Sequence, residues 1–223
     1  MMLPTTTDLF AADDESTSVG RVDVLGPGAR VLRGFALAND TSLLAALRAV
    51  VAAAPLRHMV TPGGLRMSVA MTNCGSLGWV SDRRGYRYDP LDPQTGRPWP
   101  PMPASFAQLA ARAAAHAGFA GFAADACLVN RYDAGTRLSL HQDRNERDFD
   151  APIVSVSLGI PATFLFGGDT RTERPVRVPL RHGDVVVWGG VDRLRFHGVA
   201  PLRASHHAAL GPTRINLTMR KAG

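Results

Sequence analysis

Short stretches in which apolar and polar residues alternate fill the C-terminal part of the chain, after Gly121. Strand side chains point to opposite faces in turn, so this alternation predicts strands. Gly, Pro and Asp residues break the pattern at short intervals, which favours a barrel or sandwich. The candidates are ACLVNRY, TRLSLHQD, IVSVSLGI, ATFLFGG, VRVPL, DVVVWGG, LRFHGV and RINLTMR. Roughly eight strands suit a jelly roll, in which two sheets face each other.

Two helices are predicted before this region. The stretch from Asn39 to Pro55 starts with cap-type residues, continues as an Ala-rich apolar run and ends at a proline. A second helix, from Ala104 to Gly118, follows a proline and ends at a glycine. Between them, RMSVAMTNCG resembles a strand, and GYRYDPLDPQTGRPWPPMP is expected to be an ordered loop rich in turns. The predicted fold class is mainly β with supporting helices (α+β).

The chain of 223 residues is long enough for one large domain. Residues 1–20 are polar, and we expect a flexible N-terminal tail there. Residues 21–223 are expected to form one domain, with a substrate-facing segment at 56–103 and the catalytic jelly-roll core at 122–223. Two cysteines make no disulfide framework, and neither a signal peptide nor an apolar run of membrane-spanning length is found. We therefore expect a cytoplasmic protein with no membrane partner.

The net charge is +6, and arginine supplies 24 of the 25 basic residues. A coding bias towards Ala, Arg and Gly explains this as well as function does. Arginine also binds phosphate with two parallel hydrogen bonds, which would suit a nucleic acid. Two groups of arginines favour that second interpretation: Arg83, Arg84, Arg87 and Arg97, then Arg171, Arg174, Arg177 and Arg181.

Two histidines each precede an aspartate by two residues. His182 and Asp184 flank Gly183 just before an apolar strand, so we interpret them as turn and strand-start residues. His141 and Asp143 instead share the polar face of an alternating stretch whose other face carries leucines. With a third ligand from His197, two histidines and one carboxylate would form the facial triad of non-haem Fe(II) oxygenases, which leaves metal positions open.

The stretch RINLTMR alternates strictly near the end of the chain. Its apolar residues share one face, and its other face carries Arg214, Asn216, Thr218 and Arg220. A solvated polar face is a common reason for such a pattern. Two arginines and an amide also suit a dicarboxylate, because a guanidinium can hold a carboxylate with two hydrogen bonds. Together with the histidine and aspartate pattern, this strand points to an iron and 2-oxoglutarate dioxygenase.

Long motifs carry a resemblance to a known family. They are MVTPGGLRMSVAMTNCGSLGW, DPQTGRPWPPMP, LSLHQD, APIVSVSLG, GDVVVWGG and RINLTMR. On these motifs the chain resembles the AlkB family of nucleic-acid dealkylases, specifically its bacterial type, over most of its length. The resemblance implies a double-stranded β-helix (jelly roll) and a nucleotide-recognition lid within 56–103. It also implies a monomer that acts on alkylated single- or double-stranded DNA, with RNA as a second candidate substrate.

The resemblance assigns roles to individual residues. Three match the iron ligands: His141, Asp143 and His197. Five match contacts to 2-oxoglutarate: Asn130, Tyr132, Arg214, Asn216 and Arg220. Six match or adjoin the substrate site: Met71, Trp79, Tyr86, His141, Asn145 and Arg171. Trp79 and His141 would enclose a flipped base, Tyr86 would contact the backbone, and Trp188 is expected to be an ordinary core residue.

The implied reaction consumes 2-oxoglutarate and O2 at Fe(II) and removes an N-methyl group of the 1-methyladenine or 3-methylcytosine type. Formaldehyde and succinate are released, and the base is restored. The alternative is an oxygenase of the same fold that hydroxylates a small molecule or a protein. A damage reader without activity and a jelly-roll metal protein without 2-oxoglutarate explain fewer of the motifs.

One position departs from the family pattern. The family has an acidic residue two positions after the metal-binding aspartate, where this chain has Asn145. The lesions named above are cationic, so loss of a carboxylate near the base would weaken the preference for them. Glu146 is adjacent, but neighbouring strand residues point to opposite faces, and we expect it to face away from the base.

Overall fold

The computed structural model describes residues 19–223. The tail predicted at residues 1–20 lies almost entirely outside these residues. The helices are η1 (Leu37–Asn39), α2 (Asp40–Ala53), α3 (Ala104–His116) and η2 (Gly190–Asp192). The strands are β1 (Val22–Gly26), β2 (Ala29–Leu32), β3 (Ala70–Gly75), β4 (Gly78–Asp82), β5 (Gly85–Asp89), β6 (Ala126–Tyr132), β7 (Leu138–His141), β8 (Ile153–Gly159), β9 (Ala162–Phe166), β10 (Val176–Leu180), β11 (Val185–Trp188), β12 (His197–Val199) and β13 (Arg214–Arg220).

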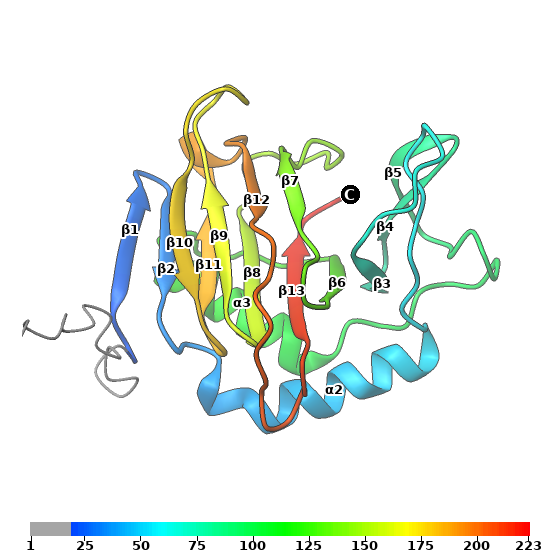
Figure 1. Cartoon of the computed structure of the whole chain (residues 1–223), viewed down its shortest axis with the longest axis horizontal. Coiled ribbons are helices and arrows are strands. Elements are labelled where there is room, and N and C mark those ends of the chain that lie inside the picture. Colours follow the sequence, from blue (N-terminus) through cyan, green and yellow to red (C-terminus); the bar gives the residue numbers. More distant parts are fainter. Residues whose placement is uncertain (1–18) are drawn as a thin grey trace, which may run out of the picture.

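Two antiparallel sheets build the body of the molecule. The larger sheet has seven strands in the order β1-β2-β11-β8-β13-β6-β3, and the smaller has four in the order β10-β9-β12-β7. The two strands β4 and β5 form a separate hairpin, which stands beside the sandwich near β3 (Figure 1). The eight strands predicted after Gly121 are found as β6 to β13, and the predicted jelly roll is confirmed.

Apart from its edge strand β1, the larger sheet is covered on both faces. One face packs against α2 and α3, where Leu43 and Phe106 meet alternate residues of the strands, among them Leu217 of β13. The other face meets the smaller sheet, where Trp188 packs with Phe164 and Phe166. Strand β13 therefore places its apolar residues under the helices and its polar residues between the sheets.

Both predicted helices are confirmed, because α2 ends just before Pro55 and α3 ends just before Gly118. The predicted loop after Gly85 is wrong in its first residues. Gly85–Asp89 forms β5 and pairs with β4 in register, with Trp79 opposite Tyr88. Strands β1, β2 and β4 were not predicted either. None of the helices found between residues 19 and 223 is long and apolar enough to cross a membrane.

His182 and Asp184 are structural, as the sequence indicated. Gly183 has a φ of +85°, a left-handed conformation that favours glycine in the turn between them. The Asp184 carboxylate accepts hydrogen bonds from the Gly34 amide at 2.9 Å and from Arg33 Nη1 at 2.8 Å. His182 Nδ1 accepts from the Gly159 amide at 2.9 Å. This pair therefore ties the turn before β11 to neighbouring loops.

Asp184→Ala should lower the free energy of unfolding by about 2–3 kcal/mol, because buried donors lose their acceptor. The cost stays moderate because Arg33 keeps a second partner, Asp23, at 2.6 Å. Urea unfolding of the variant measures the change. Asp169→Ala, in an exposed loop, is the control and should change the free energy by less than about 0.5 kcal/mol. Equal stability of the two variants would contradict this role for Asp184.

Candidate active site

Three metal-ligating side chains meet between the two sheets. His141 is the last residue of β7, and its register partner is His197, the first residue of β12. Asp143 lies two residues beyond the end of β7. The alternating stretch that predicted one strand is therefore longer than the strand that forms. Its carboxylate oxygens lie 3.7 Å from His141 Nε2 and 3.7 Å from His197 Nε2. One ligand atom from each residue lies within 4.8 Å of the others.

Both histidines offer Nε2 to this centre. His141 Nδ1 lies 2.9 Å from the Ser139 carbonyl, and His197 Nδ1 lies 3.1 Å from the Arg195 carbonyl. A carbonyl only accepts hydrogen bonds, so each Nδ1 carries the proton and leaves Nε2 free as a ligand. Burial, and then the neighbouring His197, lower the pKa of His141 to about 4. The His141 ring is therefore neutral near pH 7, as a metal ligand requires.

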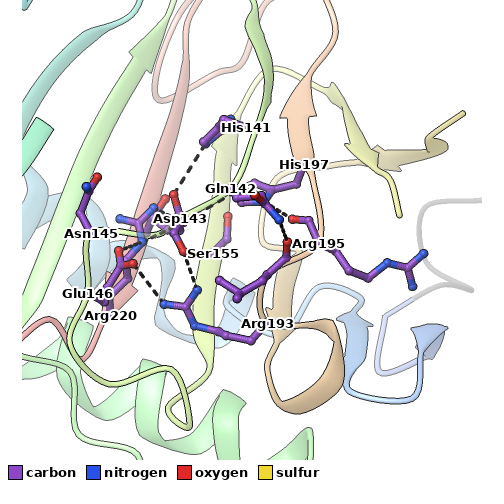
Figure 2. Close-up of polar contacts among 12 residues, drawn as sticks. His141, Gln142, Asp143, Asn145, Glu146, Ser155, Arg193, Arg195, His197 and Arg220 are labelled. Atoms are coloured by element: carbon purple, nitrogen blue, oxygen red, sulfur yellow. Dashed lines mark hydrogen bonds and ion pairs between the residues drawn. The ribbon is translucent and has the colours of Figure 1, made fainter. Parts of the chain in front are cut away.

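Arg220 of β13 keeps the aspartate charged. Its Nη2 and Nε lie 2.6 Å and 2.9 Å from Asp143 Oδ2 (Figure 2). Burial alone would raise the pKa of Asp143, but the charge of Arg220, together with His197 and His141, outweighs burial and holds the pKa well below its usual range. A carboxylate beside two imidazoles is a donor set that suits Fe(II), so the residues present fit the expected metal.

The polar face of β13 has unmet bonding capacity. Arg214 is 1% exposed, and its Nε donates to Ser157 Oγ at 3.0 Å. Its guanidinium lies 5.0 Å from the centre of the Tyr132 ring. Within residues 19–223, Arg214 Nη1 and Asn130 Oδ1 have no hydrogen-bond partner. A buried cation with a free N–H requires an acceptor, and the carboxylate of a bound ligand would supply one.

All the site residues predicted from the sequence line one cavity of about 510 Å³. The metal-ligating side chains and the polar face of β13 lie in it together with Met71, Trp79, Tyr86, Asn145 and Arg171. Met71 is buried, whereas Tyr86 is 47% exposed and Arg171 is exposed between β9 and β10. The sequence motifs therefore converge on one space, from strands far apart in the chain.

The β4–β5 hairpin covers one side of this cavity. The Trp79 and Tyr86 rings stack at a centroid distance of 5.7 Å and an angle of 15°. Trp79 Nε1 donates to Asn145 Oδ1 at 3.1 Å, and the Tyr88 hydroxyl donates to Glu146 Oε1 at 2.7 Å. Asn145 thus belongs to the cavity wall, and Glu146 is buried outside the cavity lining, as expected.

Two features of the site were missed in the sequence. Trp188 is a core residue, as predicted, but its ring also lines the cavity at 4.9 Å from the His197 ring. Val187 and Trp188 are neighbours on a strand, so their side chains point to opposite faces of the sheet. With Val187 under the helices, Trp188 could have been predicted to point between the sheets, towards the site. The second feature is a network behind Asp143 in which the half-buried Tyr88 and the buried Arg193 both contact the buried Glu146, and no motif or spacing indicated it.

Comparison with known proteins supports the interpretation of the geometry. Residues 28–220 match the model of the 2OG-Fe(II) oxygenase superfamily. The alpha-ketoglutarate-dependent dioxygenase AlkB of Salmonella typhimurium is 56% identical over 198 residues, which cover 89% of this chain and 92% of that protein. The protein of the same name from Escherichia coli is 55% identical over 199 residues, with the same shares. The solved structure of OsALKBH1 superposes with a TM-score of 0.78 at 27% identity and covers 90% of this chain and 100% of that one.

Asp143→Ala should abolish Fe(II) binding in an anaerobic titration, because it removes the anionic member of the donor set. Asp184→Ala is the matched control. It removes a buried aspartate from the other histidine and aspartate pair and should bind Fe(II) as the unaltered protein does. If Asp143→Ala still binds Fe(II) and Asp184→Ala does not, the metal-ligating pair is His182 and Asp184, and the assignment of the two pairs is reversed.

Proposed function

We infer the activity of this chain from its family, because it belongs to the AlkB family within the 2OG-Fe(II) oxygenase superfamily. We propose that it is an Fe(II) and 2-oxoglutarate-dependent dioxygenase that demethylates N-alkylated bases in DNA, with RNA as a second candidate substrate. Its substrates are lesions of the 1-methyladenine and 3-methylcytosine type, which it repairs by direct reversal. The cytoplasmic location and monomeric state expected from the sequence belong to this proposal.

One observation carries the proposal. The three metal-ligating side chains and a buried arginine with a free N–H line the same cavity, which is open beside the aromatic residues of the hairpin. A metal, a dicarboxylate and a planar base could thus occupy adjacent parts of one space. A cavity for the metal alone would not need Arg214.

Each group of residues has its own part in the proposed site. His141, Asp143 and His197 would hold Fe(II). Arg214 would bind the distal carboxylate of 2-oxoglutarate, and the other cosubstrate contacts would come from Asn130, Tyr132, Asn216 and Arg220. When bound, Fe(II), 2-oxoglutarate and O2 supply the oxidation that converts the N-methyl group to formaldehyde, with succinate and carbon dioxide as co-products. The protein orients the reactants and excludes water.

The base must leave its stack before its ring nitrogens can be reached. Trp79 and His141 would enclose it, over a floor that includes Met71. Each stacking contact would contribute about 1–3 kcal/mol. Tyr86 and Arg171 are exposed at the rim of the cavity, where they would contact the phosphate backbone.

An oxygenase of this fold that acts on a small molecule or a protein is not favoured. It would share the metal-ligating residues and Arg214. However, it accounts for neither the 55–56% identity to AlkB proteins nor the hairpin aromatics over the cavity.

The test is product formation from a methylated oligonucleotide with Fe(II), 2-oxoglutarate and O2. We expect formaldehyde and succinate in equal amounts with a 1-methyladenine oligonucleotide, and no formaldehyde with its unmethylated counterpart. Succinate release that no methylated oligonucleotide stimulates would overturn the proposal and favour a different substrate class.

Arg214→Ala should raise the KM for 2-oxoglutarate at least about 30-fold, since truncating one partner of a buried charge pair costs about 2 kcal/mol or more. Succinate formation at varied 2-oxoglutarate measures it. Arg214→Lys should recover only part of the loss, because an ammonium cannot bind both carboxylate oxygens in the same way. A KM within about threefold of the original value in the alanine variant would exclude this role.

Asn145→Asp should raise the ratio of kcat/KM for 1-methyladenine to kcat/KM for ethenoadenine, because it adds a carboxylate to the cavity wall. The acceptor for Trp79 Nε1 is retained. Since residue 145 is exposed, we expect a rise of about two- to fivefold, which corresponds to roughly 0.4–1 kcal/mol for an exposed ion pair. A flat ratio, with normal binding of iron and 2-oxoglutarate, would show that this side chain does not sense the charge of the base.

A further inference from the structure

Arg193 is a buried arginine directly behind the metal-ligating residues. Its side chain is 3% exposed, and it lies just after η2 in the segment that leads to His197. Figure 2 shows it reaching across to the loop that follows His141. Nη1 donates to the Asp143 carbonyl at 3.0 Å, and Nε donates to the Ala151 carbonyl at 3.1 Å. One guanidinium thus holds the main chain at both ends of this loop.

The third nitrogen of Arg193 forms an ion pair. Nη2 lies 3.3 Å from Glu146 Oε2, and Glu146 is only 5% exposed. The other Glu146 oxygen accepts from Tyr88 and lies 3.4 Å from Arg220 Nε. Two arginines, Arg193 and Arg220, therefore balance two carboxylates, Glu146 and Asp143, in a buried cluster. Such a cluster fixes the positions of its members, because each separation would leave a charge without a partner.

The loop needs this support because the strand does not extend to Asp143. Strand β7 ends at His141, so the sheet holds the two histidines but not the aspartate between them in space. The side chain of Gln142 donates to the Leu194 carbonyl, beside Arg193 in the same segment. Two consecutive loop residues are thus bound to the segment that carries His197.

We propose that Arg193 is a positioning residue for the three metal-ligating side chains. It fixes Asp143 relative to His197. This inference rests on the proposed metal site and concerns residues outside the expected ligand set. Groups that orient metal ligands typically change metal affinity by about 10- to 100-fold when they are removed. Arg193 acts through the main chain of Asp143 and through Glu146.

The test compares Arg193→Lys with Arg195→Lys, using Co(II) as an oxygen-stable probe of the metal site. Lysine at 193 keeps the positive charge beside Glu146. Its single ammonium group cannot contact the Asp143 carbonyl, the Ala151 carbonyl and the Glu146 carboxylate at the same time. Arg195 is a matched control two residues along. It also donates to a carbonyl, that of Gly167, and pairs with Asp192, but among residues 19–223 its side chain makes no hydrogen bond or ion pair with the loop of Asp143.

We expect Arg193→Lys to raise the Kd for Co(II) by about tenfold or more and to alter the visible spectrum of the bound ion. Arg195→Lys should leave the Kd for Co(II) within about threefold of the value for the original protein and should leave the visible spectrum unchanged. The double variant Arg193→Met/Glu146→Gln removes both charges of this ion pair together, and Arg220, which loses Glu146, keeps its pair with Asp143. It should show the same loss of affinity even if the lysine variant folds poorly.

The inference is overturned if the folded position-193 variants bind Co(II) with unchanged affinity and spectrum. It is also overturned if Arg195→Lys weakens binding equally, since the effect would then be a general loosening of the segment. Failure of the unaltered protein to bind Co(II) would overturn the proposed function as well. The two failures are therefore distinguishable.

Discussion

The ion pair between Asp143 and Arg220 is the interaction on which the site depends. Both side chains are nearly buried, with exposed fractions of 11% and 7%. A carboxylate in such surroundings tends to take up a proton, and a protonated carboxyl group is a poor metal ligand. Among the neighbouring groups, Arg220 opposes this most strongly, and it is itself held at the end of β13, a strand paired on both sides. The larger sheet thus fixes the position of Asp143 through Arg220, although Asp143 itself lies outside any strand.

The larger sheet serves the core and the site with the same strands. In β13 each apolar residue under the helices is followed by a polar one in the cavity, so the packing that stabilises Leu217 also orients Arg214 and Asn216. Strand β8 repeats this arrangement, since Ser155 and Ser157 accept bonds from Asn216 and Arg214 while Val156 packs in the core. The polar face is therefore preorganised for a charged ligand, and the helices set its position indirectly.

Features that depend on local periodicity could be predicted from the sequence. The parity of RINLTMR, the helix ends at Pro55 and Gly118, and the strands β6 to β13 are of this kind. Alternation also indicated His141, Asp143 and the polar face of β13, the resemblance supplied the remaining site residues, and all of them line one cavity. Strand β5 was missed because a hairpin across Arg83 and Arg84 lacks a standard turn signal. Arg193 could not be predicted, because its role arises from contacts with residues 42 and 50 positions away.

The attachment of the β4–β5 hairpin determines how it can move. Trp79 and Tyr88, which face each other across the hairpin, are bonded to the consecutive loop residues Asn145 and Glu146. The hairpin is thus fastened at its root, and Ser81 near its turn also donates a hydrogen bond to the Val60 carbonyl at 2.6 Å. The Trp79 indole beside the cavity is thereby anchored from both ends of the hairpin, whereas the turn residues Arg83 and Arg84 stay exposed to solvent.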